Sequence, residues 1–341
     1  MRLLIVTQKV DKADPILGFF HRWIEEFAKN CEHVIVVGQM VGEHALPSNV
    51  TVLSLGKERG SWRGVQILRY QWLLFTRRKE YDAIFVHMTP IWAVAAWLCT
   101  SRFAILFFRK PVYLWYEARG KRWPLRVALL LVRKAFSASR AGMPIVTKKS
   151  VITGHGIDTE FFRPAAMGHK KEMLLTISRI TASKRLPILL HMLTQLPPPY
   201  RLTVMGLPLT PADEKEFASL KESVTTLGLQ GRIEFNWHPQ EKIPALLQLA
   251  GLFVHASATS LDKALLEAMA CECLVLSCAD AARGVLPDQC LAKPDTMAHW
   301  VEALLSLPEQ QQDALRKQLR EIVVKDHSLE RLVKRLVQEM T

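Results

Sequence analysis

A regular alternation of short apolar runs with helical segments is the feature that most constrains the fold of this chain. The runs RLLIVTQ (residues 2–8), HVIVVG (33–38) and LFVHAS (252–257) are each bordered by a stretch with helical periodicity. Strands that alternate with helices predict an α/β fold, a parallel sheet with helices on both faces. The alternation runs through all 341 residues, a length that suggests two domains.

A polar segment containing Pro and Gly, RPAAMGHKK (residues 163–171), separates the two halves. We therefore predict a first domain over residues 1–164, a linker over 165–172 and a second domain over 173–341, whose last helix is a candidate to pack back on the first domain. Two doubly wound domains of this kind face a central cleft, and their ligands bind at the carboxyl ends of the strands.

Neither a signal peptide nor a membrane span is predicted. The first apolar run is short, and no small-residue cleavage site follows it. The strongest span candidate, residues 91–108, is interrupted by Arg102, whereas a span needs about 20 largely apolar residues. We expect a buried helix, a turn and a strand there. None of the six cysteines forms a C-x-x-C pair, which favours reduced, buried thiols in a cytoplasmic protein.

The charge is divided unequally along the chain. Residues 1–165 hold 25 Lys and Arg against 12 Asp and Glu, whereas residues 166–341 hold 20 of each, so the first half carries the whole net charge of +13. Aromatic and basic residues are interleaved at 61–79 and 119–136. This pattern favours an anionic membrane surface as a partner. A solvated helix face over core aromatics is the first alternative, and nucleic acid binding is the second and less favoured one.

The motifs of several other α/β classes are missing. The first strand is not followed by G-x-G-x-x-G, and the sequence contains no G-x-x-x-x-G-K-[ST], H-E-x-x-H or G-x-S-x-G. These absences disfavour a dinucleotide fingerprint, a P-loop, a zinc protease and a serine hydrolase.

Two segments of the second half carry residues suited to a nucleotide diphosphate. In TISRITASKR (176–185), Arg179 and Lys184 follow a strand, and a guanidinium with an ammonium suits a diphosphate. The alternative is a solvated basic loop.

In LFVHASATSLDKALLEAMA (252–270), Ser257, Thr259 and Ser260 are candidate N-caps of a helix whose positive end suits an anion. Glu267, among apolar neighbours in that helix, suits two ribose hydroxyls. A structural ion pair or a partly exposed carboxylate is the alternative for Glu267.

Together these segments resemble the GT-B glycosyltransferases, and within them glycosyltransferase family 4. That family carries an E-x(7)-E motif in an LLEAMA-like helix, and its second Glu matches Glu267. Its GR…K loop is matched by Arg179 and Lys184, and its NGID…F.P segment by GHGIDTEFFRP (154–164). Gly18 stands at the loop of the family's first helix.

The resemblance implies a GT-B fold of two Rossmann-like domains and a retaining transfer that needs no metal or other cofactor. The second domain would bind a UDP- or GDP-sugar and the first domain the acceptor. The implied catalytic residues are Arg179, Lys184 and Glu267, with stabilisation of the departing diphosphate as the main role of the two cations. The implied donor-binding residues are Arg179, Lys184, Gly206, His238, Thr259, Ser260, Leu261, Asp262, Lys263 and Glu267, and the acceptor-side candidates are Gly18, His87, Glu117 and Arg119.

The chain departs from the family pattern at several positions. Thr259 replaces the first motif Glu, which is typical of an SLDK…LEAMA variant subgroup. Ala118 replaces a His, and His87 is either its partial substitute or a satisfied polar residue at a strand end. Glu272 and Leu274 stand where Gly and Pro are usual, so we expect a reshaped turn.

We therefore predict a hexosyltransferase that is peripherally associated with the cytoplasmic face of the membrane. Its acceptor would be a lipid-linked sugar or a growing cell-surface glycan, as in polysaccharide or lipopolysaccharide biosynthesis. The alternatives are a GT-B sugar-nucleotide epimerase and a non-catalytic GT-B-like scaffold. The sugar, the linkage and the oligomeric state stay open.

Overall fold

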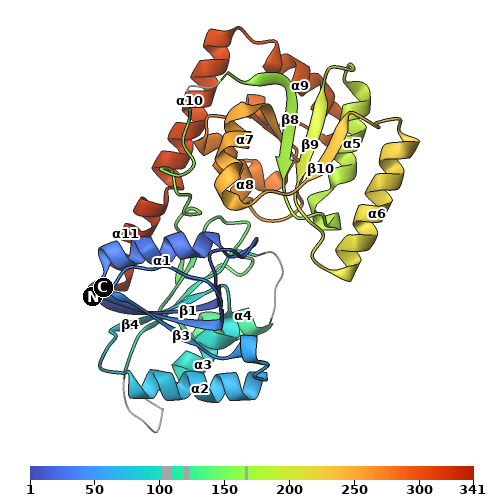
Figure 1. Cartoon of the computed structure of the whole chain (residues 1–341). Helices are drawn as coiled ribbons and strands as arrows, with labels where there is room; N and C mark the ends of the chain where they lie inside the picture. Colours follow the sequence, from blue (N-terminus) through green and yellow to red (C-terminus); the bar gives the residue numbers. More distant parts are fainter. Residues whose placement is uncertain (101–108, 119–122, 166–167) are drawn as a thin grey trace. The chain divides into compact units, whose positions relative to one another are not determined.

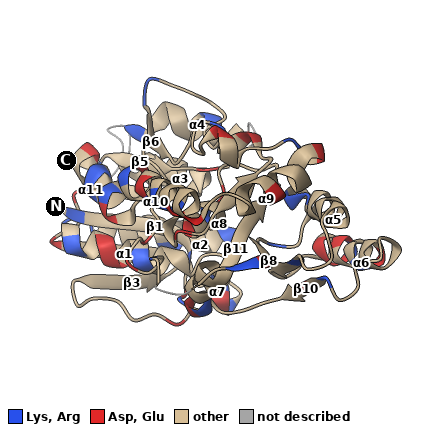
Figure 2. Cartoon of the chain, turned by 90° about the horizontal axis from the view of Figure 1, so that it is seen from above, with Lys and Arg blue, Asp and Glu red and all other residues tan. Residues whose placement is uncertain are grey.

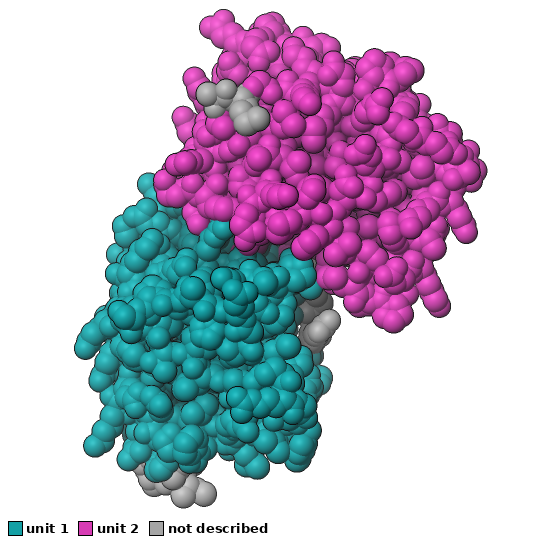
Figure 3. Space-filling model, viewed as in Figure 1, with its two compact units in different colours: residues 1–156, 328–341 teal, residues 157–327 magenta. Residues whose placement is uncertain are grey.

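The computed structural model describes residues 1–100, 109–118, 123–165 and 168–341, which form two α/β units (Figures 1 and 3). Unit 1 comprises Met1–Gly156 and Ser328–Thr341, and unit 2 comprises Ile157–His327. The division thus falls before residue 164, the end of the first domain in the sequence-based prediction. The amide of Ile157 donates to the carbonyl of His327 at 2.7 Å, which joins the two ends of unit 2.

Unit 1 is built on a seven-stranded parallel sheet with the order β3-β2-β1-β4-β5-β6-β7. Its strands are β1 (Arg2–Val10), β2 (His33–Val41), β3 (Val50–Ser54), β4 (Ala83–His87), β5 (Val112–Trp115), β6 (Lys134–Ser137) and β7 (Ser150–Ile152). From β1 the chain adds β2 and β3 on one side, and then β4 to β7 on the other side, as in a doubly wound fold.

Helices cover both faces of this sheet (Figure 1). They are α1 (Phe19–Asn30), α2 (Arg63–Thr76), α3 (Pro90–Thr100), α4 (Trp123–Leu131) and α11 (Leu329–Met340), together with the short η1 (Lys57–Arg59). Leu3 and Ile5 of β1 pack with α1 and α11, whereas the alternate residues Leu4 and Val6 pack with α2, α3 and α4. Both faces of the strand are therefore buried, which explains its continuous apolar run.

Unit 2 has a five-stranded parallel sheet with the order β10-β9-β8-β11-β12. Its strands are β8 (Lys170–Ile177), β9 (Arg201–Met205), β10 (Ile233–Asn236), β11 (Ala250–His255) and β12 (Val275–Ser277). Its helices are α5 (Leu186–Gln195), α6 (Pro211–Thr226), α7 (Ile243–Leu249), α8 (Lys263–Ala270), α9 (Met297–Leu305) and α10 (Glu309–Asp326), with the short η2 (Ala182–Lys184), η3 (Gln240–Lys242), η4 (Asp280–Ala282), η5 (Asp288–Cys290) and η6 (Pro294–Thr296).

The strand order places a topological switch point between β8 and β11. From β8 the chain adds β9 and β10 on one side, and then β11 and β12 on the other. The loops that leave β8 and β11 therefore diverge at the carboxyl edge of the sheet, where doubly wound folds bind ligands. These two loops carry most of the predicted donor residues.

The span candidate is partly described. Its first part lies in α3, and residues 101–108 lie outside the described residues. Among the helices that the structure describes, none is long and apolar enough to cross a membrane. All six cysteines are buried and unbridged, as predicted.

Candidate active site

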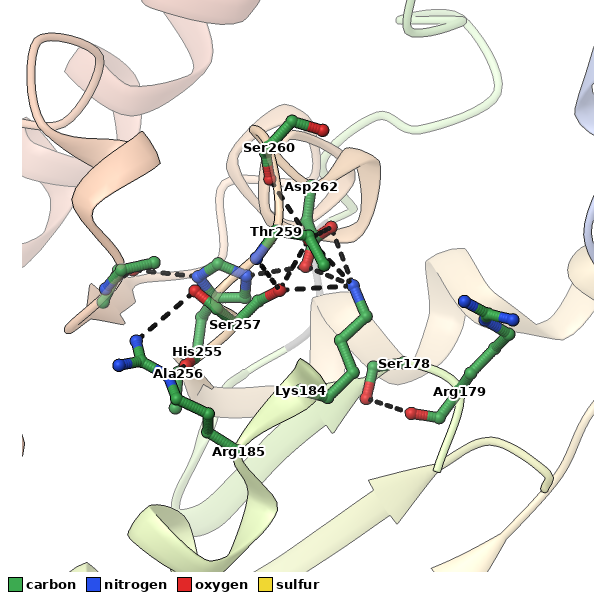
Figure 4. A network of polar contacts seen from close by, with 12 residues as sticks. Ser178, Arg179, Lys184, Arg185, His255, Ala256, Ser257, Thr259, Ser260 and Asp262 are labelled. Carbon is green, nitrogen blue, oxygen red and sulfur yellow. Dashed lines mark hydrogen bonds and ion pairs between the residues drawn. The ribbon is translucent and has the colours of Figure 1, made fainter. Parts of the chain in front are cut away.

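Lys184 lies at the centre of a polar cluster at the switch point of unit 2 (Figure 4). Lys184 is the last residue of the short helix η2, which follows β8, and its ammonium group points to the loop after β11. The Nζ atom donates to the two carboxylate oxygens of Asp262 at 2.7 and 2.8 Å. It also lies 3.3 Å from Ser257 Oγ and 3.5 Å from Thr259 Oγ1. The loops after β8 and β11 are thus joined through one cation.

Asp262 is the N-cap residue of α8, but its side chain makes no capping hydrogen bond. Its carboxylate instead accepts from Lys184, from Thr259 Oγ1 at 3.0 Å and from His255 Nε2 at 2.9 Å. Burial alone would raise the pKa of Asp262, but the hydrogen bond from His255 and the charge of Lys184 hold this pKa well below its usual range. Asp262 is therefore a carboxylate at neutral pH.

His255 extends the cluster into the sheet. It is the last residue of β11 and is buried, with Nδ1 2.8 Å from Ser277 Oγ at the end of β12. Ser277 Oγ in turn accepts from the amide of Ala279 at 3.1 Å. Because Nε2 faces a carboxylate, that nitrogen carries a proton and donates it. Ser277, His255 and Asp262 thus form a chain of polar contacts that ends at Lys184.

Arg185 fixes the loop backbone next to the cluster. Its guanidinium donates to the carbonyl oxygens of Ala256, Ser257 and Cys278. Arg185 and His255 are not among the site residues predicted from the sequence. A histidine at the end of an otherwise apolar strand, in LFVHAS, was the signal that could have identified the latter.

Arg179 lies in the same loop as Lys184, and its side chain is exposed. In Figure 4 the two side chains extend in the same direction, with no contact drawn between them. A hydrogen bond from Thr181 and the charge of Arg179 lower the pKa of Asp213, at the start of α6. Gly206, at the end of β9, borders this loop, since a Cβ there would lie 1.8 Å from the Ser178 carbonyl oxygen. Arg179 and Gly206 therefore flank the cluster without joining it.

Lys263 and Glu267 lie one turn apart on α8, and both are half-buried. Burial lowers the pKa of Lys263, and the Glu267 carboxylate acts in the opposite sense. Among the other predicted donor residues, Ser260 offers its carbonyl to Thr259 Oγ1 at 3.3 Å, and Leu261 is buried in the core. His238 lies after β10, and no contact described by the structure joins it to the cluster.

The acceptor-side candidate His87 ends β4 in unit 1 and is buried. Its ring stacks on Phe20, with centroids 4.0 Å apart, and on Trp115 at 5.5 Å. Nδ1 lies 3.3 Å from Thr7 Oγ1. His87 therefore sits within an aromatic cluster at the carboxyl end of the strand.

Glu117 is held by the segment that follows β6. Its Oε2 accepts from Ser137 Oγ at 2.7 Å and from the amides of Ala138 and Ser139 at 2.9 and 3.1 Å, while Oε1 accepts from Ser139 Oγ at 2.8 Å. Burial raises the pKa of Glu117, and these hydrogen bonds limit the rise. The carboxylate thus anchors a loop of unit 1. The neighbouring candidate Arg119 lies outside the described residues.

Gly18 precedes α1 and lies against the loop after β1. A Cβ at this position would lie 2.6 Å from the carbonyl oxygen of Asp14. Asp14 organises the loop, because Oδ1 accepts from the amides of Ile16 and Leu17 and Oδ2 from Lys9 Nζ. The absence of a side chain at Gly18 therefore permits a tight loop at the carboxyl end of β1.

The cluster in unit 2 has the properties of an anion site. The Lys184 ammonium is paired with Asp262 in the cluster. Arg179 adds a positive charge beside it, and the positive end of α8 faces the same loop. The Asp262 side chain makes no capping hydrogen bond to the first amides of α8. In the described part of the chain, no three His, Cys, Asp or Glu side chains are grouped as metal ligands would be.

Comparison with known proteins identifies the family. The model of the glycosyl transferases group 1 matches residues 158–335, which is more than half of the chain. The chain belongs to the glycosyl transferases group 1. The protein is therefore a transferase. No curated protein matches it in sequence.

Several solved structures share the fold of this glycosyltransferase. Anabaena HepE in complex with UDP and glucose is similar over 100% of this chain and 99% of its own, with a TM-score of 0.77 and 17% identity. Sucrose-phosphate synthase from Thermosynechococcus elongatus is similar over 99% and 98%, with a TM-score of 0.79 and 15% identity. A glycosyltransferase from Rickettsia africae is similar over 99% of this chain and 97% of its own, with a TM-score of 0.73 and 14% identity. The GT-B fold predicted from the sequence is confirmed.

Proposed function

We propose that this glycosyltransferase moves a hexose from a UDP- or GDP-sugar to a lipid-linked or cell-surface glycan acceptor, with retention of the anomeric configuration. The observation that carries the proposal is the contact of Lys184 with Asp262, Ser257 and Thr259 at the switch point of unit 2. Binding of UDP and UDP-glucose by Anabaena HepE supports a nucleotide sugar as the donor. Membership of family 4 and of its SLDK variant belongs to the same proposal.

Each part of the donor has a proposed partner in unit 2. Arg179, Lys184 and the amino end of α8 bind the diphosphate. Glu267, one turn inside α8, accepts hydrogen bonds from the two ribose hydroxyls. Thr259, Ser260, Asp262 and Lys263, at the start of α8, are the proposed contacts of the sugar.

The role of the cations follows from the charge that the reaction creates. As the bond from the sugar C1 to the phosphate oxygen breaks, the departing diphosphate gains negative charge. Lys184 and Arg179 stabilise this charge from fixed positions, which is the role a metal ion plays in other transferases. Lys184 is already held in place by Asp262, so little reorganisation is needed at that step.

The acceptor would bind to unit 1, and the reaction would take place at the cytoplasmic face of a membrane. The excess of basic residues in the first half of the chain supports this part of the proposal. The loop that Gly18 and Asp14 organise and the strand end at His87 are the candidate acceptor contacts.

A donor screen tests the proposal. UDP-, GDP- and ADP-sugars are incubated with the full chain, with and without a lipid-linked acceptor, and nucleotide release and sugar products are measured. We expect release from a UDP- or GDP-sugar and a product that keeps the anomeric configuration. An epimerised sugar formed without acceptor would identify an epimerase, and no release or transfer from any donor would indicate a scaffold.

A further inference from the structure

We propose that the outward side of α2, α3 and α4 in unit 1 docks on an anionic lipid bilayer. This inference rests on the proposed function, because it names the surface through which the enzyme would reach a membrane-bound acceptor. We call this surface the outer helical face. It is defined by the exposed side chains of Trp62, Leu68, Trp72, Ile91, Leu98, Trp123 and Leu130.

These large apolar side chains are unusually exposed. Trp62 is 70% exposed, Trp72 62% and Trp123 69%. Single exposed apolar residues are normal on a soluble protein, but several large ones on three neighbouring helices indicate an interaction site. Tryptophan is typical of membrane interfaces, where its ring contacts the apolar region and its N–H group contacts water or headgroups.

The three helices lie side by side in one layer. They cover the same face of the sheet (Figure 1), with α3 next to both α2 and α4. Each helix buries a second set of apolar residues against the sheet, including Leu74 of α2, Ala96 of α3 and Leu125 of α4. A helix that is apolar on its inner and its outer side is typical of a helix that is covered on both sides.

The charges on this layer complement an anionic surface. The helices α2, α3 and α4 contain the arginines Arg63, Arg69 and Arg126 and no Asp or Glu. On the opposite face of the sheet, α1 and α11 carry acidic and basic residues side by side (Figure 2). Arg and Trp on the same helices, without Asp or Glu, suit anionic headgroups over an acyl layer.

An open, mostly apolar hollow lies on this surface. It runs between the edge strand β3 and α2, has a volume of about 530 Å³, and is lined by Leu53, Val65, Leu68, Trp72 and Leu73 with Arg69 at its side. Arg69 Nη1 is held by the carbonyl of Leu55 at 2.9 Å. The hollow thus places an apolar surface beside the Arg69 guanidinium. The apolar surface suits the acyl chain of a lipid, and the guanidinium suits an anionic headgroup.

Sedimentation with vesicles tests the proposal on the full chain. Vesicles of phosphatidylcholine are compared with vesicles in which about a third of the lipid is phosphatidylglycerol, at low and at high salt. We expect binding to the anionic vesicles that weakens with salt. We also expect the double variant Leu68→Ser, Trp72→Ser to bind at least about tenfold more weakly, because both side chains would insert. Leu227→Ser, Val324→Ser, which changes two exposed apolar residues of unit 2, is the matched control and should bind like the wild type.

Two further measurements distinguish the possible outcomes. Thermal unfolding and sugar-nucleotide binding without vesicles should be the same for the Leu68/Trp72 variant and the wild type, which shows that the variant is folded. Equal binding of the variant and the wild type to anionic vesicles would overturn the proposal. A change in oligomeric state confined to the variant would also overturn it and would assign the face to a second copy of the chain. Binding of the wild type to anionic vesicles, with no binding of a sugar nucleotide, would overturn the proposed donor site and not the outer helical face.

Discussion

At the residue scale, the hydrogen bonds of the Asp262 carboxylate organise the candidate site. Asp262 occupies an N-cap position, where an Asp side chain usually accepts from the helix amides. Here it accepts from Lys184 and His255 instead. The Lys184 ammonium is thereby positioned, and the first amides of α8 receive no capping hydrogen bond from this side chain.

Replacement of Asp262 by Asn tests this role through the dependence of stability on pH. The pKa of Asp262 is depressed in the folded state, so its contribution is complete above the ordinary pKa of an Asp, about 3.9, and is lost as the pH falls through the folded value. We expect Asp262→Asn to lower the free energy of unfolding by about 2 kcal/mol or more at pH 7. The difference from the wild type should shrink below about pH 4.

Urea unfolding at a series of pH values measures this difference. Asp280→Asn is the control, because the Asp280–Arg283 pair is exposed and should change stability by less than about 0.5 kcal/mol. A loss of stability in Asp262→Asn that stays constant from pH 7 to pH 3 would show that the carboxylate charge is not the cause.

Glu267 is tested by comparing two ligands. If its carboxylate binds the ribose, Glu267→Gln should weaken UDP or GDP binding by about 2 kcal/mol, because a hydrogen bond to a charged group is lost, and should leave inorganic pyrophosphate binding unchanged. Calorimetric titration of both ligands measures this, with Glu321→Gln on the exposed side of α10 as control. Equal weakening of both ligands would instead assign Glu267 a role in the shape of α8.

The sequence identified only part of this site. Lys184, Thr259 and Asp262 could be predicted because each lies in a recognisable segment after a strand. His255 and Ser277 were not identified, because their contact depends on the pairing of β11 with β12, which single segments do not specify. Glu267 stands out in the sequence as an acid among apolar residues, and in the structure Lys263 lies one turn from it.

At the scale of elements, buried polar contacts hold the strand ends that sequence patterns leave open. Glu117 ties the end of β5 to the segment after β6 through four hydrogen bonds. At the turn before β12, Glu272 has a φ of 58°, the left-handed region that favours glycine. The pattern of strands and helices could be predicted from periodicity. The hydrogen bonds of Glu117 could not, because they join segments that are distant in the sequence.

Replacement of Glu117 by Gln tests the link at β5. A Gln side chain has one acceptor oxygen, which can replace Oε2, and an NH₂ group, which would meet the Ser139 hydroxyl that now donates to Oε1. It also lacks the charge that strengthens the four hydrogen bonds. We expect Glu117→Gln to lower the free energy of unfolding by about 1–3 kcal/mol. Denaturant unfolding measures this, with the exposed Glu80→Gln as control. Unchanged stability of Glu117→Gln would contradict the anchoring role.

At the scale of the whole molecule, the end of the chain completes the first unit. Leu332 and Leu336 of α11 are buried in the same core as Phe20 and Trp23 of α1. The alternation of strands and helices predicted two α/β domains, but the place of the last helix depends on which apolar faces are still uncovered. The last helix was a candidate to pack back on the first domain, and in the structure α11 packs there against α1.

Hydrogen exchange tests the place of α11. Leu336→Ala should destabilise the protein by about 2–4 kcal/mol, because it leaves a cavity in the core of unit 1. Amides of α1 and β1 should exchange faster, and those of α5 in unit 2 should keep their rates. The exposed Leu227→Ala is the control. Faster exchange in α5 with α1 unaffected would contradict this division of the chain.

The central claim is that unit 2 binds a nucleotide sugar through Lys184, and thermal unfolding in the presence of UDP- or GDP-sugar tests it most directly. At a hundredfold excess over the dissociation constant, the ligand should stabilise the wild type by about 2.7 kcal/mol. Lys184→Met should lose most of this stabilisation, whereas Lys317→Met, which removes an exposed charge from α10, should retain it. Absence of stabilisation of the wild type by any of these nucleotide sugars, or equal stabilisation of the wild type and Lys184→Met, would contradict the claim.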